Sequence, residues 1–328
     1  MPLRVTSRTV AERAGVSRSA VSRVFTPGAS VSEKTARKVR KVADEMGYRP
    51  NVLARGLLTG RSRIIGLVVA YLDNQFYPGV LEKLSAALEK KGYHVLIFMA
   101  AQTAGNIEEV AEDILDYQID GLVLASVALS SNLAQRCRAR GVPVVLFNRH
   151  QGDDQLSVVS DNVQGGRLAA RHLMARGARR IAHIAGWEGA STQVDREAGF
   201  LAELAKAGHS LHARAVGDFH PERARAAARD MFAGPDHPDA VFVANDYMAF
   251  PVMDVIRHEK GLRIPDDVAI VGFDDVAVAE WPSYDLTTIR QDGEAMVEAT
   301  MKVLLESIDG QTPEPLLIPV DLVKRGSS

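Results

Sequence analysis

Residues 9–25 read TVAERAGVSRSAVSRVF and predict two short helices joined by a tight turn. Gly15 ends the first helix, because glycine readily adopts the left-handed backbone found after a helix C-terminus. Ser17 is a good N-cap for the second helix, on which Val21 and Val24 recur at helical spacing. This pattern is typical of a helix-turn-helix, whose second helix lies in the major groove of DNA.

The opposite face of the second helix is polar and basic. Arginine can donate two hydrogen bonds to a guanine edge, and serine hydroxyls bind bases or phosphates. An ordinary solvated surface is the alternative, but the contrast with the apolar face favours DNA. We therefore expect DNA contacts from Ser17, Arg18, Ser19, Ser22 and Arg23.

A third helix is predicted from Ser32 to about Met46, and a short segment follows that we expect to become helical only with a partner. Residues 51–60 offer about two helical turns, and isolated helices below about 12–15 residues are marginal in water. Gly56 costs a helix about 1 kcal/mol relative to alanine. Leu57 has no evident core to enter, and such apolar side chains are used as wedges between base steps of the minor groove.

The charge of the chain is unevenly distributed. Residues 1–61 hold 13 lysines and arginines against four acidic residues, a net charge of +9, which leaves −11 for the rest of a chain whose total is −2. A basic segment on an acidic body suggests a polyanion as the partner of that segment alone. Charge by itself is equally compatible with a solvated basic helix face, and the helix pattern decides for DNA.

Four short motifs in this basic segment carry a family resemblance. They read TVAERAGVS at residues 9–17, AVSRV at 20–24, VSEKT at 31–35 and GYRPN at 47–51. Together they resemble the headpiece of the lactose and purine repressor (LacI/GalR) family. The resemblance implies that Arg18 and Ser19 discriminate bases, that Arg23 is a further base reader, and that Leu57 is wedged into the central base step of an operator. The DNA contacts expected from the hinge are Asn51, Ala54, Arg55 and Leu57. Gly56 departs from the family's hinge pattern.

Apolar runs alternate with amphipathic stretches through the rest of the chain. Continuous apolar strands, such as residues 64–70 and 181–185, predict parallel doubly wound sheets when helices separate them. The predicted helices are residues 78–91, 106–117, 163–176, 196–207, 221–232, 247–258 and 294–308. The pattern restarts near Ser160, so we expect two lobes with a cleft at the carboxyl ends of their strands.

The body also resembles the sugar-binding type I periplasmic proteins. The predicted fold class is therefore an all-α helix-turn-helix headpiece followed by a two-lobed α/β domain of that type. The resemblance implies a DNA-binding domain at residues 1–50, a hinge at 51–61 and an effector-binding and dimerisation domain at 62–328. In that arrangement the first lobe takes about 62–160 and 291–324, and the second takes about 161–290.

Polar and aromatic side chains follow several of these strands, where a cleft is expected. Ligands rich in hydroxyl groups need carboxylate, amide and guanidinium groups on one pocket, with aromatic rings for their apolar faces. From the sequence alone Tyr77 and Arg149 are candidates. The resemblance implies effector contacts at Asn74, Phe76, Asn148, Arg196, Phe219, Asn245, Asp274 and Gln291. The alternative is a local cap for Asp246 and Asp275, and a surface position for Arg149.

The position of Asn148 often carries aspartate in members of that family. An amide in place of a carboxylate removes a strong acceptor for sugar hydroxyls and adds a donor. With Arg196 and Arg149 expected nearby, we hypothesise a ligand with negative charge, such as a sugar acid.

Several kinds of site lack support. The sequence has no GxxxxGK phosphate loop, no GxGxxG fingerprint and no GxSxG elbow, so we expect no cofactor and no enzyme activity. His209 and His212 have no third ligand nearby in sequence, so we expect no metal site. Cys137, the one cysteine, stands between two arginines that would lower its pKa, although an inert helix position is the more common case.

The sequence also suggests where the protein works. Its longest apolar run, around residues 64–72, is far below the roughly 18 residues of a membrane span. No signal peptide is visible at the start, so we expect a cytoplasmic protein.

Three functions compete at this point. The first is a transcriptional regulator, most often a repressor, that binds a pseudo-palindromic operator as a homodimer and senses a sugar-like or sugar-acid effector, either as inducer or as co-repressor. The second is a sugar-binding protein without a DNA role, against which the basic segment argues. The third is a sugar-modifying enzyme, which would need a base or metal site. The sequence favours the first, and the tail has no leucine heptads for a tetramer.

Overall fold

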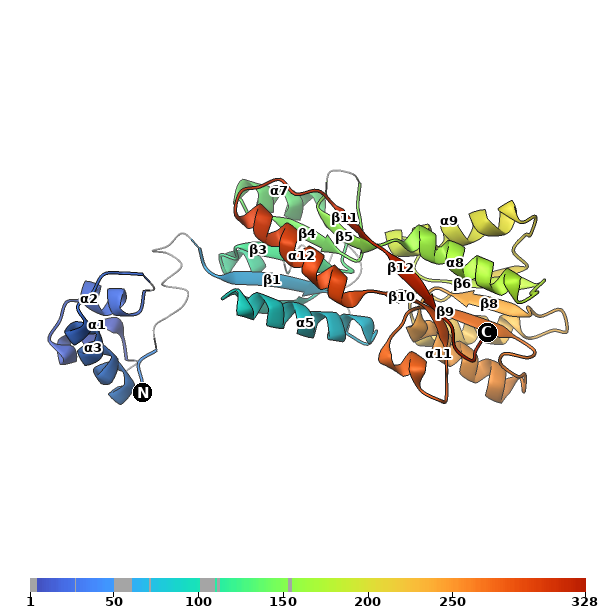
Figure 1. Cartoon of the computed structure of the whole chain (residues 1–328), viewed down its shortest axis with the longest axis horizontal. Coiled ribbons are helices and arrows are strands. Elements are labelled where there is room, and N and C mark those ends of the chain that lie inside the picture. The colour runs from blue at the N-terminus through green and yellow to red at the C-terminus, as the bar shows by residue number, and fades with distance from the viewer. Residues whose placement is uncertain are drawn as a thin grey trace. The chain divides into compact units, whose positions relative to one another are not determined.

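The computed structural model describes residues 5–26, 28–49, 61–70, 72–100, 110, 113–152 and 155–328. The chain divides into two compact units, Met1–Arg63 and Ile64–Ser328, each with its own core (Figure 1). No helix in the described ranges is long and apolar enough to span a bilayer. The predicted hinge contacts at Asn51, Ala54, Arg55 and Leu57 lie outside the described residues.

The described residues of the first unit form three helices: α1 (Ser7–Ala14), α2 (Arg18–Val24) and α3 (Glu33–Glu45). Thr6 and Thr9 cap each other's backbone at the start of α1, so this helix begins two residues before its predicted start. Gly15 follows α1 with φ of 58°, a left-handed backbone that glycine adopts without a Cβ clash. The turn between α1 and α2 is therefore encoded locally.

The core of the first unit confirms the predicted apolar faces. Ser17 and Ser32 accept the backbone N–H groups of Ala20 and Thr35, and so begin α2 and α3 at the predicted places. The buried side chains are Val10, Ala11, Ala14, Val21, Val24, Ala36, Val39 and Ala43. Small and β-branched residues dominate this set, which lets the three short helices approach closely.

The second unit contains two six-stranded sheets. The first sheet is entirely parallel, in the order β11-β5-β4-β3-β1-β2. Its strands are β1 (Ile64–Val69), β2 (His94–Met99), β3 (Gly121–Ala125), β4 (Val144–Phe147), β5 (Ser157–Ser160) and β11 (Leu316–Ile318). The helices around it are α5 (Phe76–Lys90), α7 (Ser131–Ala139) and α12 (Gly293–Ile308).

Alternate residues of β1 enter different clusters. Ile65 and Leu67 pack in the cluster that contains side chains of α5 and α12, whereas Ile64 and Val68 pack with side chains of α7. A strand covered on both faces needs apolar residues at every position, which explains the uninterrupted run in the sequence.

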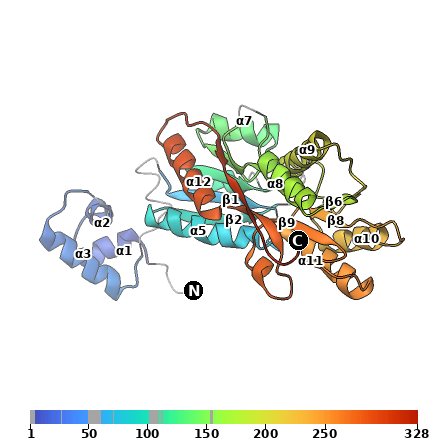
Figure 2. The same ribbon diagram turned by 45° about the vertical axis from the view of Figure 1, so that its right-hand side comes forward.

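The second sheet has the order β12-β10-β9-β8-β6-β7, and only its edge strand β12 is antiparallel. Its strands are β6 (Ile181–Ala185), β7 (Ala213–Val216), β8 (Ala240–Val243), β9 (Ala269–Asp274), β10 (Thr287–Gln291) and β12 (Val320–Val323). The helices of this lobe are α8 (Asn162–Ala175), α9 (Ser191–Lys206), α10 (Pro221–Met231) and α11 (Asp246–Asp254), with α8 and α9 on one face and α10 and α11 on the other (Figure 2). A π-helix, Val255–Glu259, follows α11, and a short 3-10 helix lies at Ala277–Glu280.

Helices α8 and α9 cross with almost no space between their backbones. A Cβ atom on Gly199 would lie 2.0 Å from the carbonyl oxygen of Val163, and one on Gly166 would lie 2.0 Å from that of Arg196. Only glycine permits this approach. The crossing fixes the place of α9, and with it the place of Arg196.

The predicted fold class is confirmed, with differences in detail. The chain passes between the two lobes after β5, after β10 and after β11, and Figure 1 shows the last segment running from one sheet to the other. The expectation that the first lobe extends to residue 324 is wrong, because β12 pairs with β10 in the second sheet. Arg196 does not open its helix, since α9 begins at Ser191. Much of the helix expected at 106–117 lies outside the described residues.

Candidate functional site

A narrow pocket of about 10 Å³, room for about one water molecule, lies where the carboxyl ends of strands from both sheets meet. This cleft pocket is lined by side chains from both lobes. They are Asn74, Tyr77, Ser126, Asn148, Thr192, Arg196, Phe219, Asn245 and Asp274. All but three of them carry an amide, carboxyl, guanidinium or phenol group, so the pocket is polar and rich in hydrogen-bonding groups.

Backbone strain is concentrated at this pocket. Ser126, Asn148, Phe219 and Asp274 lie just beyond strands or at their ends, with φ of 60°, 58°, 58° and 128°. A left-handed backbone costs a non-glycine residue on the order of 1–3 kcal/mol and persists only where the surroundings hold it. Such strain gathered around a pocket is typical of a functional site.

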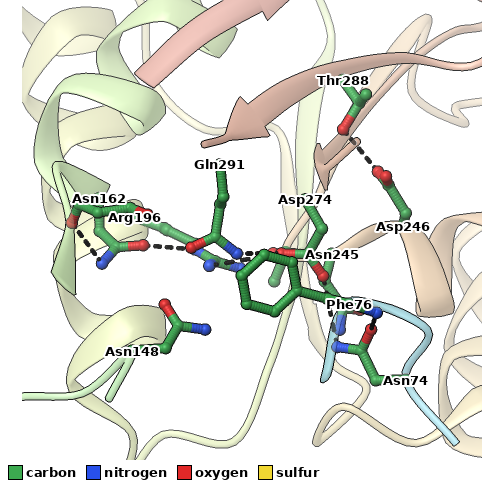
Figure 3. A network of polar contacts seen from close by, with 12 residues as sticks. Asn74, Phe76, Asn148, Asn162, Arg196, Asn245, Asp246, Asp274, Thr288 and Gln291 are labelled. Atoms are coloured by element: carbon green, nitrogen blue, oxygen red, sulfur yellow. Dashed lines mark hydrogen bonds and ion pairs between the residues drawn. The ribbon is translucent and has the colours of Figure 1, made fainter. Parts of the chain in front are cut away.

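An ion pair between Arg196 and Asp274 occupies the centre of the site (Figure 3). The Arg196 guanidinium lies 3.7 Å from an Asp274 carboxylate oxygen and donates to the Asn162 side chain at 2.9 Å and to the Ala244 carbonyl at 2.7 Å. Its carbon lies 3.6 Å from the centre of the Phe273 ring. Both charged side chains are 3% exposed, so the pair is held rigidly out of water.

Two amides complete the surroundings of Asp274. Gln291 donates to one carboxylate oxygen at 2.7 Å, and Asn74 donates to the other at 3.3 Å. The Asn74 side chain also accepts the backbone N–H of Phe76, which fixes its orientation. Since Asn74 belongs to the first lobe and Asp274 to the second, this hydrogen bond joins the lobes across the pocket.

A second buried carboxyl group lies behind Asp274. Asp246 accepts hydrogen bonds from the Thr288 hydroxyl at 2.6 Å and from the Val276 backbone N–H at 3.1 Å, so it does not cap α11; Asn245 does. Burial, and next the charge of Asp274, raise the pKa of Asp246 to about 7. Burial likewise raises the pKa of Asp274 to about 6, although Arg196 and the two amides act in the opposite direction.

A phenol and an amide form the wall on the first lobe. The Asn148 side chain donates to the Tyr77 hydroxyl at 3.1 Å, and that hydroxyl forms a further hydrogen bond with Ser126. Burial raises the pKa of Tyr77, so its hydroxyl stays protonated at neutral pH. Phe76 packs edge-on against Tyr77 and stacks on Phe147, which places it in the apolar support of this wall.

Most of the predicted effector contacts meet at the cleft pocket. Gln291 reaches it through Asp274, and Arg149 is buried with its guanidinium 5.2 Å from the Trp187 ring centre, so the surface alternative for Arg149 is wrong. Sequence reasoning missed Ser126 and Thr192, although Ser126 follows β3 as Asn148 follows β4. Whether these residues contact an effector stays a prediction.

The cleft continues outward beyond Phe219. A wider pocket of about 390 Å³ shares this ring with the cleft pocket and is lined further by Ala70, Asp73, His220, Pro221, Glu222 and Tyr247. Its volume is within the roughly 300–1,000 Å³ of typical ligand sites, whereas the cleft pocket, at about 10 Å³, is far smaller.

Other reactive side chains are not arranged for chemistry. Cys137 is buried, and burial raises the pKa of its thiol to about 11, so the inert interpretation holds. Across the described ranges no three histidine, cysteine or acidic side chains gather as metal ligands.

The polar face of α2 in the first unit is open. Ser17, Arg18, Ser19 and Arg23 are exposed, and Ser22 is half-buried. Arg18 donates to the Ser7 hydroxyl at 3.3 Å and Arg23 to the Ser19 carbonyl at 3.4 Å, both of them weak contacts that a nucleic acid can replace.

Comparisons with known proteins agree with both units. A family model described as "Bacterial regulatory proteins, lacI family" matches residues 8–51, and one described as "Periplasmic binding protein-like domain" matches residues 170–328. The HTH-type transcriptional regulator CelR of Thermobifida fusca is 34% identical over 97% of this chain and 96% of its own length. The HTH-type transcriptional repressor PurR of Vibrio atlanticus is 30% identical over 94% and 93%.

Solved structures show the same similarity. A lac repressor dimer bound to operator and the anti-inducer ONPF has a TM-score of 0.88 at 29% identity and covers 98% of each chain. A complex of CelR with cellobiose has a TM-score of 0.75 at 32% identity, over 99% of this chain and all of the other.

Proposed function

Since the chain belongs to the LacI family of bacterial regulatory proteins, it is a sequence-specific DNA-binding transcriptional regulator, and we propose that it represses its target genes. We also propose that a sugar-like effector in the cleft pocket controls its affinity for the operator. The observation that carries this proposal is the pairing of an open, basic α2 face with a polar pocket between two lobes, within one chain.

We propose that α2 enters the major groove. Arg18, Ser19 and Arg23 would contact base edges, whereas Ser17 and Ser22 would position the helix on phosphates. In a homodimer two such helices read half-sites about one helical turn apart, or a multiple of it, so the operator is pseudo-palindromic. Asn51, Ala54, Arg55 and Leu57 would then contact the minor groove between the half-sites.

The polar pocket supports a ligand rich in hydroxyl groups. The relative CelR is known in complex with cellobiose, and the lac repressor in complexes with ONPG and with the anti-inducer ONPF. In this chain Asp274, Asn74 and Gln291 offer carboxylate and amide groups, and Phe219 offers a ring face to the same space. We propose effector contacts at these residues and at Phe76, Tyr77, Asn148, Arg149, Arg196 and Asn245.

Ligand binding can reach the DNA-binding unit through the relative position of the lobes. The two sheets are joined by three crossings of the chain and by the Asn74–Asp274 hydrogen bond at 3.3 Å. A ligand that inserts between these side chains changes how the lobes lie against each other. Coupling of this kind is typically 1–3 kcal/mol, a change in operator affinity of about 5-fold to 150-fold.

We assign the DNA-binding domain to residues 1–50, the hinge to 51–61 and the effector-binding and dimerisation domain to 62–328. The relatives are transcriptional regulators, and we propose that the bound sugar is released unchanged. A regulator of bacterial genes works where the chromosome lies, so we also propose a cytoplasmic location.

Removal of residues 1–61 tests the proposal. We expect the remaining chain to lose operator binding and to retain ligand binding, because the pocket is formed entirely by the second unit. Operator binding by the shortened chain would contradict the assignment.

A further inference from the structure

Arg149 is a buried cation with an empty hydrogen-bonding edge. Its residue is 5% exposed, and both Nε and Nη2 lie out of contact with solvent and without a hydrogen-bond partner in the described part of the chain. A buried charge that is left unpaired costs several kcal/mol, so a partner from outside the chain would stabilise Arg149.

The same guanidinium edge, Nε and Nη2, binds carboxylates at other arginines of this protein. Four other arginines use Nε and Nη2 side by side to bind both oxygens of one carboxylate. These pairs are Arg171–Glu203, Arg214–Glu197, Arg229–Glu259 and Arg263–Asp267, with N–O distances from 2.5 to 3.2 Å. A carboxylate therefore fits the free edge of Arg149 in shape as well as in charge.

Arg149 does not itself line the cleft pocket but is a near neighbour of residues that do. Asn148, the preceding residue, and Tyr77 both line this pocket, and the positive charge of Arg149 acts on the Tyr77 hydroxyl against the stronger effect of burial on its pKa. The guanidinium also lies over the Trp187 ring. A ligand in the cleft can thus place one of its groups against Arg149.

Three carboxylates of the second lobe already pair with arginines. The pairs are Arg196–Asp274, Arg214–Glu188 and Arg223–Asp218. Of the two arginines expected near a negative ligand, Arg196 is therefore paired with Asp274, whereas Nε and Nη2 of Arg149 have no partner in the described residues.

Besides the two Arg149 nitrogens, two buried acceptor atoms indicate which other groups the ligand carries. The side-chain oxygens of Asn148 and Gln291 are also buried without a hydrogen-bond partner in the described residues. Each needs a donor, which a sugar hydroxyl supplies. An anionic group with hydroxyl groups around it would satisfy all four atoms.

We propose that the effector is a sugar acid, an aldonate or uronate, whose carboxylate binds the Nε and Nη2 edge of Arg149 while its hydroxyls donate to Asn148 and Gln291. This inference rests on the proposed function, because it names the ligand class of the same cleft.

Calorimetric titration of the full-length protein with matched ligand pairs tests the proposal. The pairs are D-galacturonate with D-galactose, D-glucuronate with D-glucose, and D-gluconate with D-glucitol. We expect the acid to bind about tenfold to hundredfold more tightly than its neutral partner in at least one pair, as is typical of hydrogen bonds to charged groups. A neutral sugar that binds as tightly as its acid in every pair, failure of every acid to bind, or a preference for D-glucose 6-phosphate over all the acids would overturn the proposal.

Substitution of Arg149 locates the effect. Arg149→Gln is expected to abolish the preference for the acid. Arg149→Lys is expected to weaken acid binding about tenfold, because lysine keeps the charge but lacks the two adjacent N–H groups that bind both carboxylate oxygens. Arg171→Gln is the control, because Arg171 also binds a carboxylate through Nε and Nη2 but does not line the cleft pocket. This substitution should change the affinity for neither the acid nor the neutral sugar. Equal loss of acid and neutral binding in Arg149→Gln would refute the role of Arg149. Operator affinity measured on the same preparations reports separately on the proposed function.

Discussion

Replacement of Asp246 by asparagine should make the stability of the second unit less sensitive to pH. Asp246 is completely buried, and burial raises the pKa of its carboxyl to about 7, against roughly 3.9 in an unfolded chain. A pKa that is raised in the folded state means that folding favours the protonated form. The stability gained from this group is complete at low pH and is lost as the pH rises through about 7.

The magnitude follows from the distance of the pH below that pKa. At pH 5.5 the folded group is almost fully protonated while the unfolded group is ionised, so each pH unit up to about 7 costs about 1.4 kcal/mol. Above about pH 7 both states are ionised and stability no longer changes, so about 2 kcal/mol is lost between pH 5.5 and pH 8.5. Asparagine resembles the protonated acid: it can accept the Val276 N–H and donate to the Thr288 hydroxyl. Relative to the wild type, Asp246→Asn should therefore gain about 2 kcal/mol between pH 5.5 and pH 8.5.

Urea unfolding followed by tryptophan fluorescence measures this difference. The two tryptophans, Trp187 and Trp281, both lie in the second unit, so the signal reports on that unit alone. Asp267→Asn is the matched control. A hydrogen bond from Arg263 lowers the pKa of Asp267 to about 2, so its effect should be constant across this pH range. If the free-energy difference between Asp246→Asn and the wild type does not change with pH, burial does not raise the pKa of Asp246 in the folded protein.

Three further predictions follow from the two units. Arg23→Ala should weaken operator binding by about 1–3 kcal/mol and relax sequence preference, as measured by fluorescence anisotropy; an unchanged preference would exclude direct base readout. Gly199→Ala should destabilise the second unit by about 1–3 kcal/mol or more in urea unfolding, because its methyl group meets a carbonyl 2.0 Å away, and an unaltered midpoint would show that the helices can separate freely. The Cys137 thiol should react with iodoacetamide at pH 8 only after unfolding, because burial raises its pKa to about 11; rapid labelling of the native protein, followed by mass spectrometry, would contradict this.

The three described helices of the first unit could be predicted from sequence, apart from the start of α1, because their signals are local. Ser17 and Ser32 cap the helices that follow them, and Gly15 closes the helix before it. The start of α1 was missed because Thr6 and Thr9 cap each other reciprocally, a pattern that precedes the apolar stripe.

Parts of the second unit could not be predicted from local sequence signals. β11 and β12 have three and four residues and pair with strands far away in sequence, so no periodicity marks them. The assignment of residues after 319 to the first lobe failed for this reason. The contact between Thr288 and Asp246 likewise depends on the strand order and not on spacing, because Thr288 is on β10, Asp246 follows β8, and β9 lies between these strands in the sheet.

The cleft was accessible to prediction in part. Residues that follow strands were identified because the carboxyl ends of parallel strands line such clefts. What the sequence could not distinguish is which arginine is already paired. Only the folded structure shows Arg196 against Asp274 and Arg149 without a carboxylate among the residues described.

The most direct test of the whole account is the affinity of the full-length protein for an operator selected from random DNA, compared with a scrambled duplex at about 150 mM salt, with and without a saturating sugar ligand. Specific binding of this type is typically about 10³–10⁷ times tighter than non-specific binding. We expect a preference in that range, and a change of about 5-fold to 150-fold when the ligand is added. Equal affinity for the two duplexes, with ligand and without it, would show that the protein is not a sequence-specific DNA-binding regulator controlled by this ligand.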